Sequence, residues 1–331
     1  MYYFIVNEHG GSGKSASSSL WDEIKSALQA KGVRYKAFVP QYAGHATVLA
    51  RQISEEADDD IRIVIVGGDG TINEVINGIL SFERVKLGLI PSGSGNDFAR
   101  GLGIPRHNPE KALDMILESE SGTPVDLGFV KTGEKQRLFA ISAGFGLDAI
   151  VCTQSNTSKI KTALNKIKMG NMSYALLTVI NLFKMKTRNV KISFDGGALE
   201  SFDKLIFAAA MNLKAEGGGV PMSPNAKVND GKLSFCLAAG VPKVKTFFLF
   251  PMLLAGKHAR FKGFTLRDCK TADIYSQTPE ILHTDGEHAA TDSKIHIECL
   301  EKKLRVLLRL PTKKEKSNPA RKNKTRPVSR S

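Results

Sequence analysis

Three glycine-rich turns near the start of the chain constrain its fold more than any other feature of the sequence. They occupy residues 11–15, 67–71 and 91–97, and each follows a short apolar run of strand length. Apolar residues at helical spacing follow the first two turns. Strand, turn and helix in this repeated order are typical of a parallel sheet with helices on both faces. Because the carboxyl ends of parallel strands share one edge of such a sheet, we expect the three turns to meet there.

Turns of this kind can bind phosphate groups. Glycine lets the backbone approach a phosphate closely, and the N-terminus of the following helix presents N–H donors to it. An ordinary tight turn explains each motif taken alone, whereas three turns at one edge favour a phosphate site. The first turn lacks the P-loop spacing, because Glu8 stands where that motif has glycine. The sequence therefore predicts a phosphate-binding α/β domain that is not a P-loop ATPase.

The hydrophobic pattern changes near Val125. Beyond it, short alternating runs separated by turn residues predict an antiparallel β domain over residues 125–300. A basic, apolar helical insert over residues 159–187 interrupts this domain. The strand-like run at residues 301–310 is expected to return to the first domain, residues 1–124. Residues 311–331 are polar and basic, and we predict that this tail is disordered.

The net charge of +14 is concentrated in two segments. Residues 149–194 contain eight Lys or Arg and no Asp or Glu, and residues 311–331 contain eight Lys or Arg and one Glu. Such basic blocks attract anionic membranes or nucleic acids. A nucleic-acid binder would leave the phosphate turns unexplained, and only 7% of the residues are aromatic, so we expect no nucleic-acid partner.

Three features of the sequence predict a cytoplasmic protein. No apolar stretch reaches the roughly 20 residues needed to span a bilayer. The first residues lack the basic region and long apolar core of a secretory signal. The four cysteines lie far apart without a C-x-x-C pair, which is typical neither of a disulfide framework nor of a zinc site.

Together the motifs resemble the diacylglycerol kinase catalytic domain of bacterial lipid kinases, which is similar to that of sphingosine and ceramide kinases. The resemblance extends over residues 2–310 and rests on four segments: GGDGTINE at 67–74, PSGSGNDFA at 91–99, SPNAKVNDGKL at 223–233 and DGE at 285–287. It implies an α/β nucleotide domain with a parallel sheet, a C-terminal antiparallel β-sandwich domain, and an active site between the two.

The resemblance also implies an activity. The enzyme would use ATP and Mg²⁺ to phosphorylate a lipid hydroxyl, with diacylglycerol as the favoured acceptor and phosphatidic acid as the product. Another lipid of the sphingoid, ceramide or monoacylglycerol type stays open as the acceptor. A soluble enzyme like an NAD kinase is the more distant alternative, because such an enzyme needs no basic apolar helix.

The resemblance and the turn chemistry together give a set of nucleotide-contacting residues. These are Asn7, Ser12, Gly13, Lys14, Gly67, Gly68, Asp69, Gly70, Thr71, Ile72, Asn73, Gly93, Ser94, Asn96 and Asp97. Asp69 is also predicted to be catalytic, because a carboxylate beside a polyphosphate needs an intervening cation such as Mg²⁺. Asp285 and Glu287 are predicted to act as a pair that accepts the proton of the lipid hydroxyl, and which of them is the base is left open.

A second Mg²⁺ is implied by the resemblance at the turn around Asp230. Its ligands would be the Asp230 carboxylate and the backbone carbonyls of Lys227 and Lys232. Without the resemblance, the same residues read as an ordinary hairpin turn. His283 and His288, which flank the catalytic turn, are expected to have packing or surface roles.

The basic segments predict where the protein works. A basic, apolar helix without acids suits the surface of an anionic membrane, and the tail adds further positive charge. We therefore expect peripheral association with the inner face of the membrane, where the lipid substrate lies. A core helix with solvated lysines and a merely solubilising tail are the alternatives, and a homodimer is left open.

Overall fold

The first domain is built on four parallel strands. The computed structural model describes residues 1–8, 14–56, 60–157 and 170–308. Strands β1 (Tyr2–Val6), β2 (Tyr35–Phe38), β3 (Ile61–Gly67) and β4 (Val85–Pro91) pair in the order β2-β1-β3-β4. Strands β1, β3 and β4 are almost wholly buried, as the continuous apolar sequence of a parallel strand covered on both faces requires.

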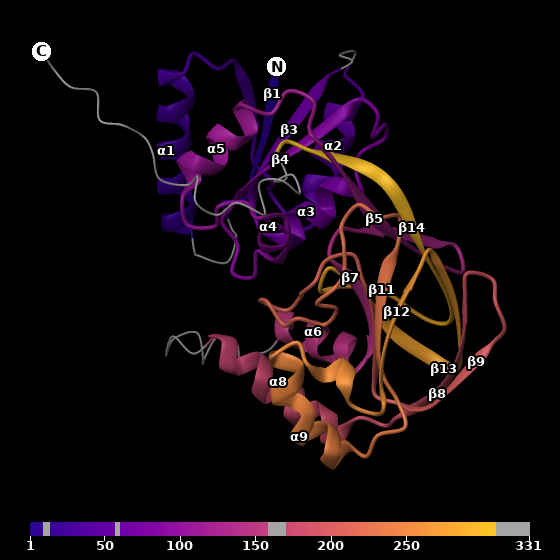
Figure 1. Cartoon of the computed structure of the whole chain (residues 1–331). Helices are drawn as coiled ribbons and strands as arrows, with labels where there is room; N and C mark the ends of the chain where they lie inside the picture. Colours follow the sequence, from indigo (N-terminus) through magenta and orange to yellow (C-terminus); the bar gives the residue numbers. More distant parts are fainter. Residues whose placement is uncertain (9–13, 57–59, 158–169, 309–331) are drawn as a thin grey trace, which may run out of the picture.

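Five helices accompany these strands (Figure 1). They are α1 (Lys14–Ala30), α2 (His45–Ser54), α3 (Asp69–Ile76), α4 (Asp97–Leu102) and α5 (Pro109–Leu117). Helices α3 and α4 begin directly at the glycine-rich turns that end β3 and β4. The expected α/β domain with a parallel sheet is therefore confirmed.

The second domain is an antiparallel β-sandwich. Its first strands are β5 (Thr123–Thr132), β6 (Lys135–Phe139), β7 (Ser142–Gly146), β8 (Arg188–Phe194) and β9 (Glu200–Leu205). They are followed by β10 (Phe207–Met211), β11 (Leu233–Ala238), β12 (Phe264–Cys269), β13 (Thr271–Thr284) and β14 (Glu287–Val306). The pairing order is β12-β11-β10-β7-β13-β14, with β8 on β13 and β5 on β14. The predicted antiparallel domain is confirmed.

Helices cover one end of the sandwich. Helices α6 (Leu147–Thr157), α8 (Gly170–Lys184) and α9 (Lys243–Leu254), with a short 3-10 turn at His258–Arg260, lie together in Figure 1. The predicted basic insert corresponds to α8 and to residues 158–169, and the latter lie outside the described residues, as does the tail at 311–331. Within the described part of the chain, no helix combines the length and apolar character needed to cross a membrane.

Strand β14 joins the two domains. It pairs with β13 and β5 in the sandwich, and its last residues, Arg305 and Val306, pair in parallel with β4 of the first domain. Leu304 and Leu307 are buried in the core of that domain. The chain thus returns to the first sheet, so that one strand belongs to both domains.

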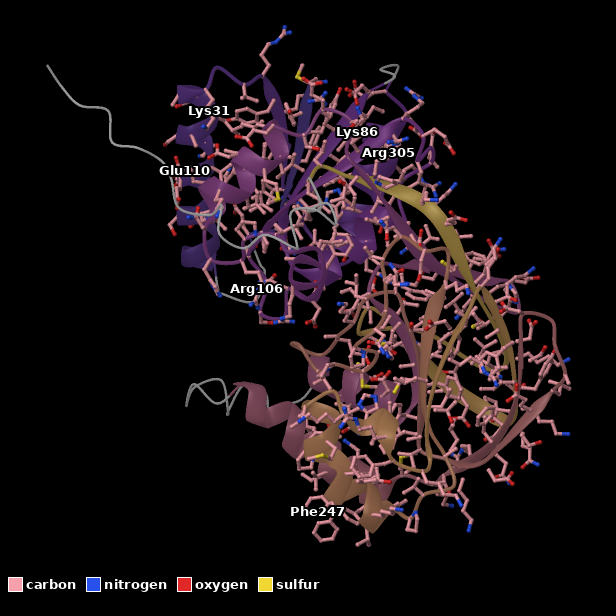
Figure 2. The ribbon with its side chains drawn as sticks, viewed as in Figure 1. Lys31, Lys86, Arg106, Glu110, Phe247 and Arg305 are labelled. Carbon is pink, nitrogen blue, oxygen red and sulfur yellow. The ribbon has the colours of Figure 1, made fainter. Side chains whose placement is uncertain are left out.

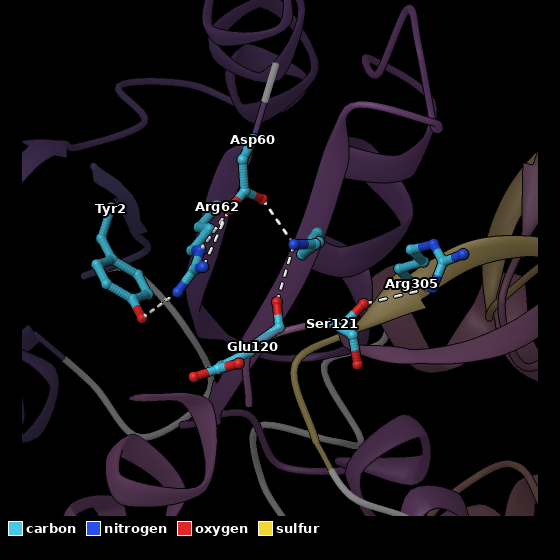
Figure 3. Close-up of polar contacts among 7 residues, drawn as sticks. Tyr2, Asp60, Arg62, Glu120, Ser121 and Arg305 are labelled. Atoms are coloured by element: carbon cyan, nitrogen blue, oxygen red, sulfur yellow. Dashed lines mark hydrogen bonds and ion pairs between the residues drawn. The ribbon is translucent and has the colours of Figure 1, made fainter. Parts of the chain in front are cut away.

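Ion pairs cover the amino ends of the parallel strands, opposite the glycine-rich turns (Figure 3). Arg62 at the start of β3 donates to the Tyr2 hydroxyl at 2.9 Å and pairs with Asp60 at 3.0 Å. Lys86 at the start of β4 also pairs with Asp60, at 2.8 Å, and Arg305 donates to the Ser121 carbonyl. Because these charged side chains already bond one another or the backbone, we assign a structural role to this edge of the sheet. The candidate active site lies at the opposite edge, where the glycine-rich turns are.

Candidate active site

The carboxyl ends of β1 and β3 meet at the first described phosphate turn. Gly67 ends β3, Gly68 precedes α3, and Asp69, Gly70 and Thr71 form the first turn of that helix. The Asn7 side chain, directly after β1, donates to the Thr71 hydroxyl at 2.8 Å.

Not every predicted nucleotide contact can be placed. Ser12 and Gly13 lie outside the described residues, and Lys14 opens α1. Ile72 is buried in the core of the first domain, so its side chain anchors α3. The structure therefore describes the second turn in full and only the last two residues of the first turn, Lys14 and Ser15.

The second and third glycine-rich turns touch through their backbones. A Cβ atom built on Gly93 would lie only 2.6 Å from the Gly68 Cα, and one built on Gly68 would lie 2.9 Å from the Gly93 Cα. Real Cβ atoms do not approach other carbon atoms so closely. Both positions therefore require glycine, and the two turns form a single surface of backbone.

Asp69 fastens these two turns together. Its two carboxylate oxygens accept the backbone N–H groups of Asp97 and Phe98, at 2.9 and 3.1 Å, so that Asp69 caps the N-terminus of α4. Burial raises the pKa of Asp69 to about 6, against the lowering effect of these N–H donors and of Arg100. A role of Asp69 toward Mg²⁺ stays a prediction.

Asn96 and Asp97 also shape the third turn. Asn96 has a left-handed φ of 51°, which asparagine tolerates better than most residues, and its side chain bonds both the N–H and the carbonyl of Gly93. The buried Asp97 pairs with Arg100 and accepts the Gly218 N–H of the second domain at 2.7 Å. Ser94 is exposed at the tip of the turn.

Asn73 and Asp285 connect the domains through buried hydrogen bonds. Asn73 on α3 donates to the Asp285 carboxylate at 2.8 Å. The N–H groups of residues 140–142 donate to the same carboxylate at 2.7 to 3.1 Å. Burial raises the pKa of Asp285 against the opposing effect of these donors. These contacts hold the turn between β13 and β14 in its left-handed conformation, with φ of 51° at Asp285.

Glu287 occupies a different environment, although it lies only two residues beyond Asp285. It is exposed at the start of β14. A Cβ atom built on Gly70 would lie 3.6 Å from Glu287 Oε1, so this carboxylate faces the first turn of α3. The structure thus separates the two acids that the sequence pairs, because Asp285 is buried and hydrogen-bonded whereas Glu287 is exposed and faces α3.

A buried polar cluster lies behind the turn between β13 and β14. His283 is fully buried, and its Nε2 lies 2.7 Å from the Asp148 carboxylate on α6. Its Nδ1 accepts the Gly286 N–H at 3.2 Å, so Nε2 carries the proton that is donated to Asp148. A Cβ atom on Gly144 would clash with this pair, since it would lie 2.0 Å from the Asp148 oxygen. His283 has the buried packing role that was expected for it, and it also links α6 to the turn between β13 and β14.

The cluster contains three potential metal ligands, but their hydrogen bonds and protonation do not suit a metal ion. Ligand atoms of Asp148, Cys152 and His283 lie within 4.8 Å of one another. However, both ring nitrogens of His283 already have hydrogen-bond partners. Burial also raises the pKa of the Cys152 thiol well above its ordinary value, so that the thiol keeps its proton.

An apolar pocket of about 310 Å³ opens beside this cluster. Helices α6, α8 and α9 and strands β10 and β12 contribute apolar side chains to its wall, among them Val151, Leu182, Phe207, Phe250, Leu253 and Phe264. Asp148 and Glu216 place two carboxyl groups on the same wall. Burial and the neighbouring Asp148 raise the pKa of Glu216 to about 8. Residues 217–219 also line the pocket, and through the Gly218 N–H they touch Asp97 of the third turn.

Comparison with known proteins decides the family. A model of the diacylglycerol kinase catalytic domain matches residues 1–130, and a model of the YegS C-terminal NAD kinase beta sandwich-like domain matches residues 141–308. The chain belongs to the diacylglycerol kinase family. It is therefore a lipid kinase, as the sequence predicts.

Relatives of this lipid kinase match it over most of their length. The diacylglycerol kinase of Mycobacterium tuberculosis is 27% identical over 287 residues, which cover 86% of each chain. The diacylglycerol kinase of Staphylococcus carnosus is 27% identical over 278 residues, which cover 84% of this chain and 86% of the relative. Among solved structures, a diacylglycerol kinase from Bacillus anthracis has a TM-score of 0.66 at 22% identity, over 93% of this chain and 96% of its own, and shares the fold.

The implied second magnesium site of this lipid kinase lies at the turn before β11. Asp230 is exposed there, and its carboxylate lies 3.7 Å from the Lys227 ammonium. Asp126 is fully buried and accepts the Gly231 and Lys302 N–H groups at 2.8 and 2.7 Å. Burial raises the pKa of Asp126, and Asp230 and Glu301 add to the increase.

These acids fit a divalent cation, because oxygen ligands suit Mg²⁺ and a cation would offset the repulsion among the three carboxylates. The sequence analysis named Lys227, Asp230 and Lys232 but missed Asp126 and Glu301, which lie 104 and 71 residues from Asp230 along the chain. Binding of Mg²⁺ at this turn stays a prediction.

Proposed function

We propose that this protein transfers the γ-phosphate of ATP to the hydroxyl of a membrane lipid, in a Mg²⁺-dependent reaction. One observation carries the proposal: the apolar pocket and the phosphate turns share a wall, because residues 217–219 line the pocket and bond Asp97. A lipid chain in the pocket would thus place its polar head beside the bound phosphates. Diacylglycerol, which the names of the relatives indicate, is the first acceptor to test, with phosphatidic acid as the product.

The phosphates of ATP would lie over the backbone surface made by Gly68 and Gly93. The N-terminus of α3 offers N–H donors there, and the absence of side chains at both glycines lets phosphate oxygens approach the backbone. Mg²⁺, when bound, would neutralise charge on these oxygens, and Asp69 is the acid that the sequence analysis assigns to it. The chain itself contributes positioning, through the contacts that fix the turns and the contacts of Asn73 that fix α3.

Glu287 is the base in this proposal. The lipid hydroxyl oxygen attacks the γ-phosphorus, the bond from that phosphorus to the ADP oxygen breaks, and the hydroxyl proton passes to the Glu287 carboxylate. The position of Glu287 opposite Gly70 supports this role. Asp285 orients the turn instead, because four hydrogen bonds already occupy its carboxylate.

The test is phosphate transfer from labelled ATP with Mg²⁺ to diacylglycerol in mixed micelles, beside NAD as a soluble acceptor. We expect labelled phosphatidic acid from the wild type, and a fall in kcat of about 10² to 10⁴ in Glu287→Gln. The melting temperature of Glu287→Gln should not change, because the side chain is exposed. Label on NAD alone would contradict the lipid acceptor, and full activity of Glu287→Gln would contradict the base.

The proposal includes peripheral association with the inner face of the membrane. The predicted attachment uses the basic insert, residues 159–187, and the tail, residues 311–331. Residues 159–169 of the insert and the whole tail lie outside the described residues. A homodimer stays open as well. The described surface of the second domain, however, offers another region for membrane contact.

A further inference from the structure

The largest group of exposed apolar side chains lies on α9 and the end of α8. Among the described residues, twelve large apolar side chains are exposed, and five of them lie on these two helices. These are Phe183, Val244, Phe247, Phe248 and Leu254, and we call them the α9 patch. Phe248 is 71% exposed and Val244 is 58% exposed. Such clustering on a soluble surface marks a contact site.

Ring contacts connect the three phenylalanines of the patch. The rings of Phe183 and Phe247 lie 6.1 Å apart, and those of Phe247 and Phe248 lie 5.4 Å apart. The Lys243 ammonium donates to the carbonyls of Phe183 and Met185, which ties the start of α9 to the end of α8. In Figure 2, Phe247 projects outward from the end of the second domain that lies away from the first domain.

The stretch of chain that carries α9 is basic. Residues 241–263 contain five Lys or Arg and no Asp or Glu. Lys184, Lys186 and Lys245 are exposed beside the apolar side chains. An apolar surface with a basic rim matches the interface of an anionic bilayer. A second copy of the chain is a poorer match, because a twofold contact would bring two positive surfaces together.

The same helix borders the proposed acceptor pocket. Phe250 and Leu253 line the pocket from α9, while Phe247 and Leu254 both line it and are exposed. Contact between the α9 patch and a bilayer would therefore place the mouth of the pocket against the acyl layer. A lipid could enter the pocket without its chain passing through water, a transfer that costs about 0.8 kcal/mol for each exposed CH₂ group.

We infer that α9 is the membrane-docking face of this protein and that its partner is an anionic lipid bilayer. The docking itself does not depend on the proposed function; only the entry of a lipid acceptor into the pocket after docking does. The apolar side chains insert at the level of the headgroups, and the lysines contact the anionic headgroups. The docking face overlaps the predicted insert only at residues 183–186, and it adds α9, which the sequence analysis did not propose.

The test compares two patch variants with one control in the full-length chain. Phe248→Ser removes the most exposed ring, and Lys245→Glu reverses a charge on the rim; neither residue lines the pocket. Tyr42→Ser, at a ring 62% exposed on the first domain, is the matched control. Binding is measured by co-sedimentation with vesicles of phosphatidylglycerol and phosphatidylcholine, and with phosphatidylcholine alone. Because every variant keeps the tail, its contribution cancels.

We expect the wild type and Tyr42→Ser to bind anionic vesicles equally, and Phe248→Ser and Lys245→Glu each to bind about tenfold more weakly or worse. Lipid phosphorylation in detergent micelles should be the same in all four proteins. Equal vesicle binding by all four proteins would overturn the inference while leaving the kinase proposal intact. A wild-type dimer that Phe248→Ser dissociates without lipid would assign the patch to a second copy instead. If the wild type did not phosphorylate lipid, the proposed function would be contradicted, whereas the inference that α9 docks on the membrane would not.

Discussion

The contact between Gly68 and Gly93 makes a sharp prediction about how the site is assembled. In Gly93→Ala, the new methyl group would lie 2.6 Å from the Gly68 Cα, whereas carbon atoms in contact are normally at least about 3.5 Å apart. The neighbour is backbone, so no side chain can rotate away. The second and third turns must therefore separate by about 1 Å.

This separation should affect both stability and activity. Overpacking of this kind costs about 1 to 3 kcal/mol of unfolding free energy, and each kcal/mol lowers the Tm by about 1 to 2 °C in a chain of this length. A displacement of about 1 Å in a positioned site costs about 100-fold in rate. Thermal unfolding and the kcat/KM for ATP measure the two effects.

Gly70→Ala is the matched control, because it adds the same methyl group where the protein has room. The nearest atom would be Glu287 Oε1 at 3.6 Å, an ordinary contact, and alanine favours a helix over glycine by up to about 1 kcal/mol. We expect an unchanged or higher Tm in Gly70→Ala together with weaker ATP binding, because the methyl group would enter the phosphate site. Wild-type Tm and kcat/KM in Gly93→Ala would refute the claim that the two turns form one rigid surface.

Three further predictions concern the contacts around the site. Asn73→Ala should lower the unfolding free energy by about 1 to 3 kcal/mol in denaturant titration, because it removes one donor from the buried Asp285 carboxylate; an unchanged midpoint would contradict the role of this contact. The pKa of Asp69 is raised from 3.8 to about 6, so the folded protein binds this proton more tightly than the unfolded chain does. The unfolding free energy should therefore decrease as the pH rises from about 4 to about 6, by at most about 3 kcal/mol. Asp69→Asn should lose this part of the pH dependence. If the unfolding free energy of Asp69→Asn changed with pH in the same way as that of the wild type, the assigned effect of burial on Asp69 would be wrong. Mg²⁺ without nucleotide should raise the Tm of the wild type and not that of Asp230→Asn, and equal increases would remove Asp230 from the magnesium site.

The sequence predicts those parts of the fold that local patterns encode. The buried strand at residues 61–67 and the glycine-rich turns give the parallel sheet and its functional edge, because glycine and β-branched residues carry their conformational meaning locally. The separate roles of Asp285 and Glu287 could not be predicted. The side chains of neighbouring residues in a tight turn point into different environments. The N–H groups that bond the Asp285 carboxylate come from residues 140–142, about 145 positions away, so the local sequence does not reveal them.

The membrane-facing helix was missed for a different reason. The apolar stretch around Phe247 is too short to span a bilayer, so the length criterion does not indicate a membrane-contacting helix there. A signal was nevertheless present, since residues 241–263 contain no acid and five basic residues. The pattern indicates a surface helix only when its outward face is known, and α9 exposes Phe248 while it buries Leu249 and Leu253.

A chain of contacts connects the lipid pocket to the proposed base. Asp148 lines the pocket and binds His283, and His283 accepts the N–H of Gly286, which directly precedes Glu287. Gly144 leaves the space in which Asp148 meets His283. Glu287 lies at the start of β14, so the backbone of the turn sets where its side chain begins. Because that backbone is bonded to the pocket through His283 and to α3 through Asp285 and Asn73, the acceptor site and the phosphate site both position the carboxylate that must act between them.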